Sequence, residues 1–123
     1  MANKLGIDIG GTKIEAILIN EQFQVIERKR VPTNREEGYY QIIHRVTNLA
    51  NELKEFGNIN SSVGICIPGK IDIQKGSLKN SSIACLIDQP LQSDLEAALS
   101  LPTLMENDAN CFALAEAILG SAK

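Results

Sequence analysis

The stretch LGIDIGGTKIEAILIN, residues 5–20, decides the fold. Its apolar residues first alternate with Gly6 and Asp8, which predicts a half-buried strand. Residues Gly10-Gly11-Thr12-Lys13 then interrupt the apolar pattern, and the β-branched run over residues 14–19 predicts a second strand. Glycine is common in tight connections between strands. The stretch therefore predicts a β-hairpin with glycines at its tip.

The glycine tip differs from the common phosphate-binding loops. A Walker-type loop needs GxxxxGK[ST], a dinucleotide-binding loop needs GxGxxG, and both lead into a helix rather than a strand. Gly10 and Gly11 would instead allow positive φ angles and remove side chains, so that backbone N–H groups can converge on an anion. Thr12 would add a hydroxyl donor, Lys13 a charge, and Asp8 a carboxylate for a hydrated Mg²⁺. The alternative is that the glycines form only a hairpin turn.

The remaining pattern predicts a layered α/β domain. Residues 23–31 predict a third strand, ended by Pro32, so the chain begins with three consecutive strands, read as antiparallel hairpins. Apolar spacings of three and four predict a helix from Tyr39 to Leu53. Downstream, the sequence predicts a buried strand over residues 62–67, a short extension over 71–73 and a loop over 77–90. A helix over 91–99, a strand over 103–105 and an alanine-rich helix over 107–119 follow. Such an order favours a mixed sheet with flanking helices.

A second group of polar residues follows the last predicted strand, in MENDANCFALAEA, residues 105–117. Strand ends in open α/β sheets are where ligands bind. Asn107 could pair with a substrate hydroxyl, and Asp108 could accept a hydroxyl proton. Alternatively, Asn107 only caps the helix and Asp108 only complements its dipole. A glycoside-hydrolase carboxylate pair, Glu106 with Asp108, has no other support in the sequence.

Composition excludes several classes of function. The 123 residues suit one domain, and a net charge of −3 argues against nucleic-acid binding. No apolar run approaches the roughly 20 residues of a membrane span, and the first strand, interrupted by Asp8, is not expected to be a secretory leader. The three cysteines, an odd number without CxxC spacing, are expected to be reduced, buried thiols rather than disulfides or zinc ligands. We therefore expect a cytoplasmic protein without membrane or nucleic-acid partners.

Three segments together resemble the ROK family (repressor, open reading frame, kinase). They are Gly6 to Lys13 (GIDIGGTK), Gly64 to Gly69 (GICIPG) and Glu106 to Asn110 (ENDAN). The resemblance extends along nearly the whole chain and implies the actin-like, ribonuclease-H-like ATPase fold. It covers only the N-terminal lobe of that family, so the expected organisation is a single lobe over residues 1–123, with the C-terminal lobe absent from this chain.

The resemblance implies a role for each matching residue. The phosphate motif that binds ATP comprises Asp8, Gly10, Gly11, Thr12 and Lys13, with Asp8 also serving Mg²⁺. The implied sugar-contacting residues are Gly69, Asn80, Ser82, Asn107 and Asp108, with Asp108 also the catalytic base. Many family members have Asn, and others Thr, where Ser82 stands, so the shorter serine leaves the identity of the sugar open.

The expected function is ATP-dependent phosphorylation of a hexose or N-acetylhexosamine hydroxyl by the complete protein. This chain would supply the phosphate-binding hairpin and the catalytic aspartate, would be inactive alone, and is expected to self-associate into a homo-oligomer. The repressor branch begins with a helix-turn-helix, whereas the first strand here begins by Leu5. The alternatives are a non-catalytic, sugar-responsive regulatory module and another actin-like ATPase, such as a chaperone or filament protein.

Overall fold

The computed structural model of the chain describes residues 3–59 and 62–107. In this part of the chain, strands and helices alternate much as the sequence predicts. The elements, with 3₁₀ helices labelled η, are β1 (Lys4–Ile9), β2 (Lys13–Ile19), β3 (Val25–Pro32), η1 (Arg35–Glu37), α1 (Tyr39–Lys54), β4 (Val63–Ile67), β5 (Lys70–Asp72), β6 (Ser77–Asn80), η2 (Ala84–Leu86), α2 (Leu91–Leu99) and β7 (Thr103–Asn107).

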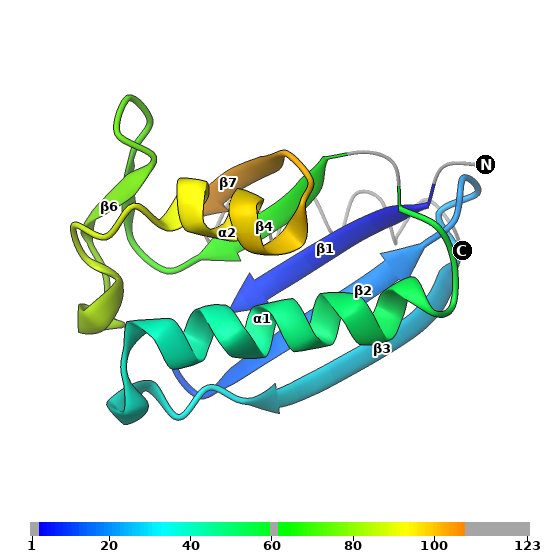
Figure 1. The fold of residues 1–123 in the computed structure, drawn as a ribbon, viewed down its shortest axis with the longest axis horizontal. Coiled ribbons are helices and arrows are strands. Elements are labelled where there is room, and N and C mark those ends of the chain that lie inside the picture. The colour runs from blue at the N-terminus through cyan, green and yellow to red at the C-terminus, as the bar shows by residue number, and fades with distance from the viewer. Residues whose placement is uncertain (1–2, 60–61, 108–123) are drawn as a thin grey trace.

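A five-stranded mixed sheet organises the molecule, in the order β3-β2-β1-β4-β7 (Figure 1). β1, β2 and β3 pair antiparallel as predicted, and β4 pairs parallel with both β1 and β7. After β2 and β3, the chain returns through α1 to place β4 beside β1, because parallel neighbours require a crossover. A separate two-stranded ribbon is formed by β5 and β6. The predicted mixed sheet with three leading antiparallel strands is confirmed.

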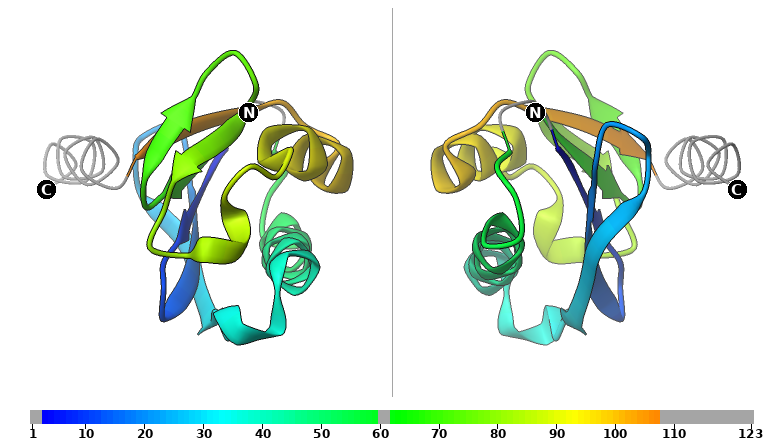
Figure 2. Two further views of the ribbon diagram at one scale, coloured as in Figure 1. Left: turned by 90° about the vertical axis from the view of Figure 1, so that its left-hand side faces the viewer. Right: turned by 90° about the vertical axis from the view of Figure 1, so that its right-hand side faces the viewer.

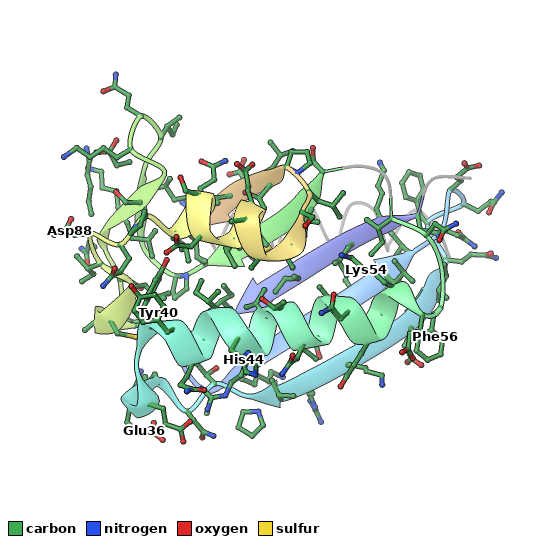
Figure 3. The ribbon with its side chains drawn as sticks, viewed as in Figure 1. Glu36, Tyr40, His44, Lys54, Phe56 and Asp88 are labelled. Carbon is green, nitrogen blue, oxygen red and sulfur yellow. The ribbon has the colours of Figure 1, made fainter. Side chains whose placement is uncertain are left out.

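Both described α-helices cover the same face of this sheet (Figure 2). Alternate residues of β1 and β2 point into the interface, as the period of two requires. The apolar stripe of α1 packs onto them, and its opposite side carries exposed residues such as Tyr40 and the single histidine, His44 (Figure 3). The largest fully buried side chains are Ile7, Ile9, Ile14, Leu18, Ile42, Leu49, Leu53, Ile65, Ile67, Leu78, Ile83 and Leu86. Burial of this apolar surface is the main favourable term in folding.

The structure corrects two predictions about elements. The predicted loop over residues 77–90 contains β6 and η2, because Leu78 is fully buried and β6 pairs with β5. Asn107, predicted to cap a helix, is instead the last residue of β7 and pairs with Ile67. The rest of the helix predicted over residues 107–119 lies outside the described residues.

The prediction of reduced, buried thiols is wrong in two respects, the oxidation of Cys66 and the burial of Cys85. Cys66 takes part in a disulfide. Cys85 is a free thiol and only half-buried, and Cys111 lies outside the described residues. The helices within residues 3–59 and 62–107 are all too short or too polar to cross a membrane.

Candidate functional site

The parallel strands bring the predicted site segments to one edge of the sheet. β1, β4 and β7 run in the same direction, and their register places Asp8 beside Cys66 and Ile67 beside Asn107. The β1–β2 hairpin, η1 and the β5–β6 ribbon lie at this same end of the molecule (Figure 1). Ligands of open α/β sheets bind outside the carboxyl ends of the strands. This edge is therefore the candidate functional site.

The tip of the β1–β2 hairpin presents two backbone donors. The Gly10 N–H donates to the Lys13 carbonyl at 2.9 Å and is not available to an anion. Within the described part of the chain, the N–H groups of Gly11 and Thr12 and the exposed Thr12 hydroxyl have no hydrogen-bond partner. Free N–H groups on successive residues are what an anion-binding turn requires.

The two tip glycines do not adopt positive φ, but the absence of side chains matters there. The described glycines with positive φ are Gly38, Gly69 and Gly76, so the part of the sequence-based explanation that invokes positive φ is wrong. A Cβ at Gly10 would lie 2.9 Å from the Lys13 carbonyl oxygen. A Cβ at Gly11 would lie 3.1 Å from Nη1 of Arg35. A side chain at Gly10 would thus collide with the backbone of the turn, whereas one at Gly11 would only require the exposed Arg35 side chain to move slightly.

Thr33, which sequence reasoning missed, fixes the hairpin tip to the end of β3. Its N–H donates to the Thr12 carbonyl at 2.9 Å, and its Oγ1 donates to the Gly10 carbonyl at 2.6 Å. Thr33 is fully buried, and its own carbonyl accepts from Nη1 of Arg45 at 2.8 Å. A buried polar residue is normally hydrogen-bonded, but no pattern in the sequence indicates that these partners lie 12 to 23 residues away.

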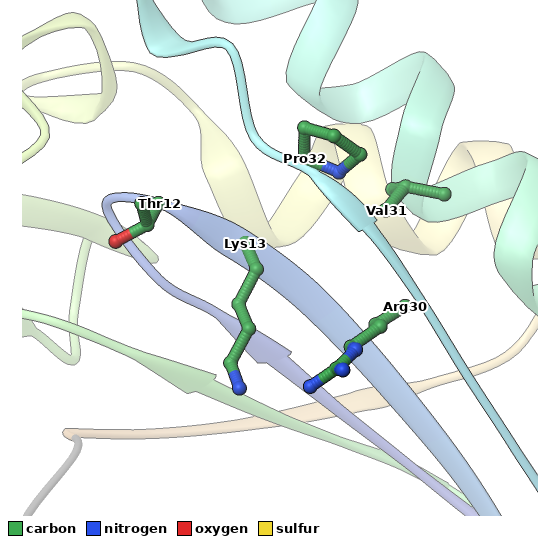
Figure 4. Close-up of a pocket in the computed structure, with 5 residues that line it drawn as sticks. All are labelled: Thr12, Lys13, Arg30, Val31 and Pro32. Carbon is green, nitrogen blue, oxygen red and sulfur yellow. The ribbon is translucent and has the colours of Figure 1, made fainter.

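Lys13 and Arg30 lie on the sheet face that α1 does not cover. Their neighbours in sequence, Ile14 and Val31, pack into the core on the opposite face. The two cationic side chains extend over the sheet and line an open hollow of about 300 Å³ with Thr12, Val31 and Pro32 (Figure 4). Lys13 therefore contributes positive charge beside the hairpin rather than inside its turn.

Asp8 is exposed near the end of β1, and the β1–β2 register places it opposite Glu15. Within residues 3–59 and 62–107, no group of three or more His, Cys, Asp or Glu side chains could hold a metal ion. Mg²⁺ is commonly held by one or two carboxylates, with water and phosphate oxygens completing its shell. The carboxylates at this position fit such a hydrated ion, and they do not fit a site made entirely of protein ligands.

The β5–β6 ribbon brings two predicted sugar-contacting residues together. Gly69 has a φ of 128°, and a Cβ there would lie 1.9 Å from the Asn80 carbonyl oxygen. Ser82 is exposed, and within the described part of the chain it makes no hydrogen bond. Its neighbour Ser81 is the structural serine, because its hydroxyl donates to the Pro68 carbonyl at 2.6 Å and accepts from the Ile83 N–H at 3.0 Å.

The last pair of predicted residues is described only in part. Asn107 is half-buried at the end of β7, beside the end of β4 that leads to Pro68 and Gly69. Asp108, the predicted base, lies outside the described residues. The structure thus brings Asn107, Gly69 and Asn80 to the same edge, and it tests no role for any of them.

Known proteins similar to this chain were found by sequence and by structure. The profile of the ROK family matches residues 4–123. The N-acetyl-D-glucosamine kinase of Yersinia pestis is 41% identical over 112 residues, which are 91% of this chain. The ROK hexokinase of Thermus thermophilus superposes with a TM-score of 0.80 at 31% identity, over 93% of this chain. A ROK family glucokinase of Streptomyces griseus, solved with glucose and AMPPNP, superposes with a TM-score of 0.81 at 28% identity, over 99%.

The similarity covers much less of the other proteins. The matched region is 43% of the Yersinia kinase and 38% of each of the two solved chains. This chain therefore shares the fold of one part of these kinases and spans less than half of their length.

Proposed function

The chain belongs to the ROK family, and from this premise we propose that it forms the N-terminal lobe of an ATP-dependent sugar kinase. The observation that carries the proposal is the β1–β2 hairpin tip, whose Gly11 and Thr12 N–H groups have no acceptor among the described residues. Such donors suit the phosphates of ATP. The relatives' names, N-acetyl-D-glucosamine kinase and hexokinase, support a hexose or N-acetylhexosamine as the substrate.

In this proposal, each segment of the sheet edge has a separate task. The hairpin binds and orients the phosphates through backbone N–H groups and the Thr12 hydroxyl, and Lys13 adds positive charge. Asp8 would hold a hydrated Mg²⁺, which would neutralise phosphate charge when bound. Gly69, Asn80, Ser82 and Asn107 position the sugar.

Asp108 is proposed to accept the proton of the attacking sugar hydroxyl. An aspartate with an ordinary pKa of about 3.9 is a weak base at pH 7. A weak base suffices here, because phosphoryl transfer has a loose transition state and depends mostly on positioning and on charge stabilisation. The contribution expected from such a base is about 10²–10⁴-fold in rate.

The test is an assay coupled to ADP release in the full-length protein that contains this chain, with Mg²⁺ and a panel of hexoses and N-acetylhexosamines. Asp108→Asn should lower kcat by about 10²–10⁴-fold. Glu55→Gln, at the exposed end of α1, removes one negative charge elsewhere and should leave kcat unchanged. ADP release that no sugar stimulates would refute the kinase function, and a near-normal kcat for Asp108→Asn would refute only the role of Asp108.

A further inference from the structure

We propose that Arg35 is a phosphate-binding residue of the hairpin site, completing a donor set with the N–H groups of Gly11 and Thr12. The inference rests on the proposed function and assigns it a residue outside the matched motif segments. The expected ligand is the terminal phosphates of a nucleoside triphosphate, recognised as a chain of phosphoryl groups without contact to the base or sugar.

The position of the guanidinium is the first observation. Nη1 of Arg35 lies 3.1 Å from the place that a Cβ on Gly11 would occupy. The cation therefore sits directly against the turn whose Gly11 and Thr12 N–H groups have no acceptor in the described part of the chain. Three kinds of donor therefore lie on or beside the same turn: two backbone amides, one hydroxyl and one guanidinium.

The second observation is that the charge of Arg35 is not neutralised by the described residues. The residue is exposed, and the ion pairs of residues 3–59 and 62–107 do not include it. Its neighbour Arg45 behaves differently, because its guanidinium pairs with Glu37 and donates to the Thr33 carbonyl. Arg45 is thus a structural arginine, whereas Arg35 retains five N–H donors in a planar fork that suits phosphate oxygens.

The third observation is that the segment leading into Arg35 is anchored to the hairpin through Thr33. Thr33, two residues earlier, makes both hydrogen bonds to the tip. The Arg35 carbonyl accepts from the Gly38 N–H at 3.2 Å and from the Cys85 thiol at 3.9 Å. A guanidinium on an anchored backbone loses less freedom on binding than one on a mobile loop, which favours a binding role.

The test is calorimetric titration of the 123-residue chain with inorganic tripolyphosphate, which has the phosphates and lacks the nucleoside. Arg35→Ala should weaken binding roughly ten- to a hundredfold, as expected for charge-assisted hydrogen bonds. Arg35→Lys keeps the charge without the fork and should recover only part of the affinity. Arg28→Ala is the matched control: it removes an exposed cation from β3 and should change affinity by less than about fivefold.

Two further measurements separate binding from folding. Thermal unfolding of Arg35→Ala should match the wild type, since within the described part of the chain the side chain makes no hydrogen bond or ion pair. In ¹H–¹⁵N spectra, tripolyphosphate should shift the Gly11 and Thr12 amides of the wild type, and much less those of Arg35→Ala at equal concentration.

Equal affinity of Arg35→Ala and Arg28→Ala would overturn the inference, and so would a wild-type chain that does not bind tripolyphosphate. A different result is expected if the proposed kinase function is wrong. In that case, tripolyphosphate would still bind through Arg35, whereas the full-length protein would show no sugar-dependent ADP release.

Discussion

Gly69 is the residue whose backbone conformation and surroundings most strongly require glycine. Its φ of 128° lies in a region that other residues rarely adopt, and a Cβ would come within 1.9 Å of the Asn80 carbonyl oxygen. Gly69→Ala should therefore destabilise the fold by about 1–3 kcal/mol from backbone strain alone, with the collision adding to this loss. It should also displace the predicted sugar-contacting loop. Urea unfolding of the chain measures the first effect.

Gly64→Ala is the control for that measurement. Gly64 lies in β4, with negative φ and no atom within 4 Å of the Cβ position. Alanine there should cost nothing and is expected to stabilise by up to about 1 kcal/mol, because glycine is unfavourable within a strand. Equal unfolding free energies for the two variants would show that neither the φ nor the contact with Asn80 matters.

For single residues, the sequence predicts which residues form the site better than it predicts why each one is needed. It indicates Gly10, Gly11 and Thr12 as an anion-binding turn, and the structure leaves two N–H groups there without an acceptor among the described residues. It attributes the glycines to positive φ and to the absence of side chains; the structure shows no positive φ there, and a Cβ at Gly10 would crowd the Lys13 carbonyl. Thr33 and Arg35 could not be predicted, because their contacts join segments that are distant in the sequence.

Among the elements, the end of β3 determines the position of the hairpin. Thr33→Val keeps the shape of the side chain but removes the 2.6 Å hydrogen bond to the Gly10 carbonyl. Because this bond is made by a fully buried residue, its loss should cost about 1–3 kcal/mol. Urea unfolding measures the loss. In the same variant, the Gly11 and Thr12 amides should broaden or shift in ¹H–¹⁵N spectra.

Thr47→Val is the control for Thr33→Val, because it removes a threonine hydroxyl within a helix. The Thr47 hydroxyl donates to the Ile43 carbonyl, four residues earlier in α1, and this carbonyl already belongs to the helical hydrogen-bond ladder. We expect a change within about 0.5 kcal/mol. A loss at Thr47 as large as that at Thr33 would contradict the proposed link between β3 and the hairpin.

A tyrosine joins the two helices. The Tyr39 hydroxyl in α1 donates to Oδ2 of Asp94 in α2 at 2.7 Å. Burial, and then the hydrogen bond to Asp94, raise the pKa of Tyr39 well above its ordinary value. Tyr39→Phe should cost about 1–2 kcal/mol at pH 7.

The raised pKa of Tyr39 determines how the cost of Tyr39→Phe in unfolding free energy depends on pH. In the unfolded chain, Tyr39 loses its proton near pH 10, whereas in the folded chain it keeps the proton to higher pH. The stabilisation is therefore complete below about pH 10 and declines above it. The gap in unfolding free energy between wild type and Tyr39→Phe should be constant at neutral pH and shrink at pH 11. Tyr40→Phe, which alters an exposed ring, should show no such gap at either pH.

Strong local patterns made most elements predictable. α1 and α2 follow apolar spacings of three and four, and α2 begins and ends where the sequence predicts. β6 was missed, because Ser77–Asn80 is mostly polar and becomes a strand only by pairing with β5. The extension of β7 to Asn107 was missed for a similar reason, since pairing with β4 overrides the preference of asparagine for a helix cap.

For the whole molecule, alternation of strands and helices predicts a layered sheet, and the motif resemblance identifies which one. Within the order β3-β2-β1-β4-β7, the β1–β4 and β4–β7 pairings join segments that are distant in the sequence. No periodicity in the sequence encodes them. The identity of the proposed sugar could not be predicted either, because the described residues near Gly69 present backbone atoms and an exposed Ser82.

The 123 residues by themselves are expected to bind phosphate without catalysing sugar phosphorylation. The candidate site lies along one edge of the sheet, and the chain spans 43% of the Yersinia kinase. We expect the chain alone to bind tripolyphosphate but to release no ADP in response to hexoses or N-acetylhexosamines, because catalysis requires both substrates to be held and shielded from water. The control is the full-length protein in the same ADP-release assay.

Sugar-dependent turnover by the chain alone would contradict this expectation, and its concentration dependence would show why. A rate proportional to protein concentration would mean that these residues suffice as a monomer. A rate rising with the square of concentration would mean that a second copy completes the site. Such a copy could pack on exposed apolar side chains such as Ile73, which is 87% exposed, and Leu104, which is 65% exposed. Sedimentation at matching concentrations distinguishes the two cases, because only the second requires a dimer.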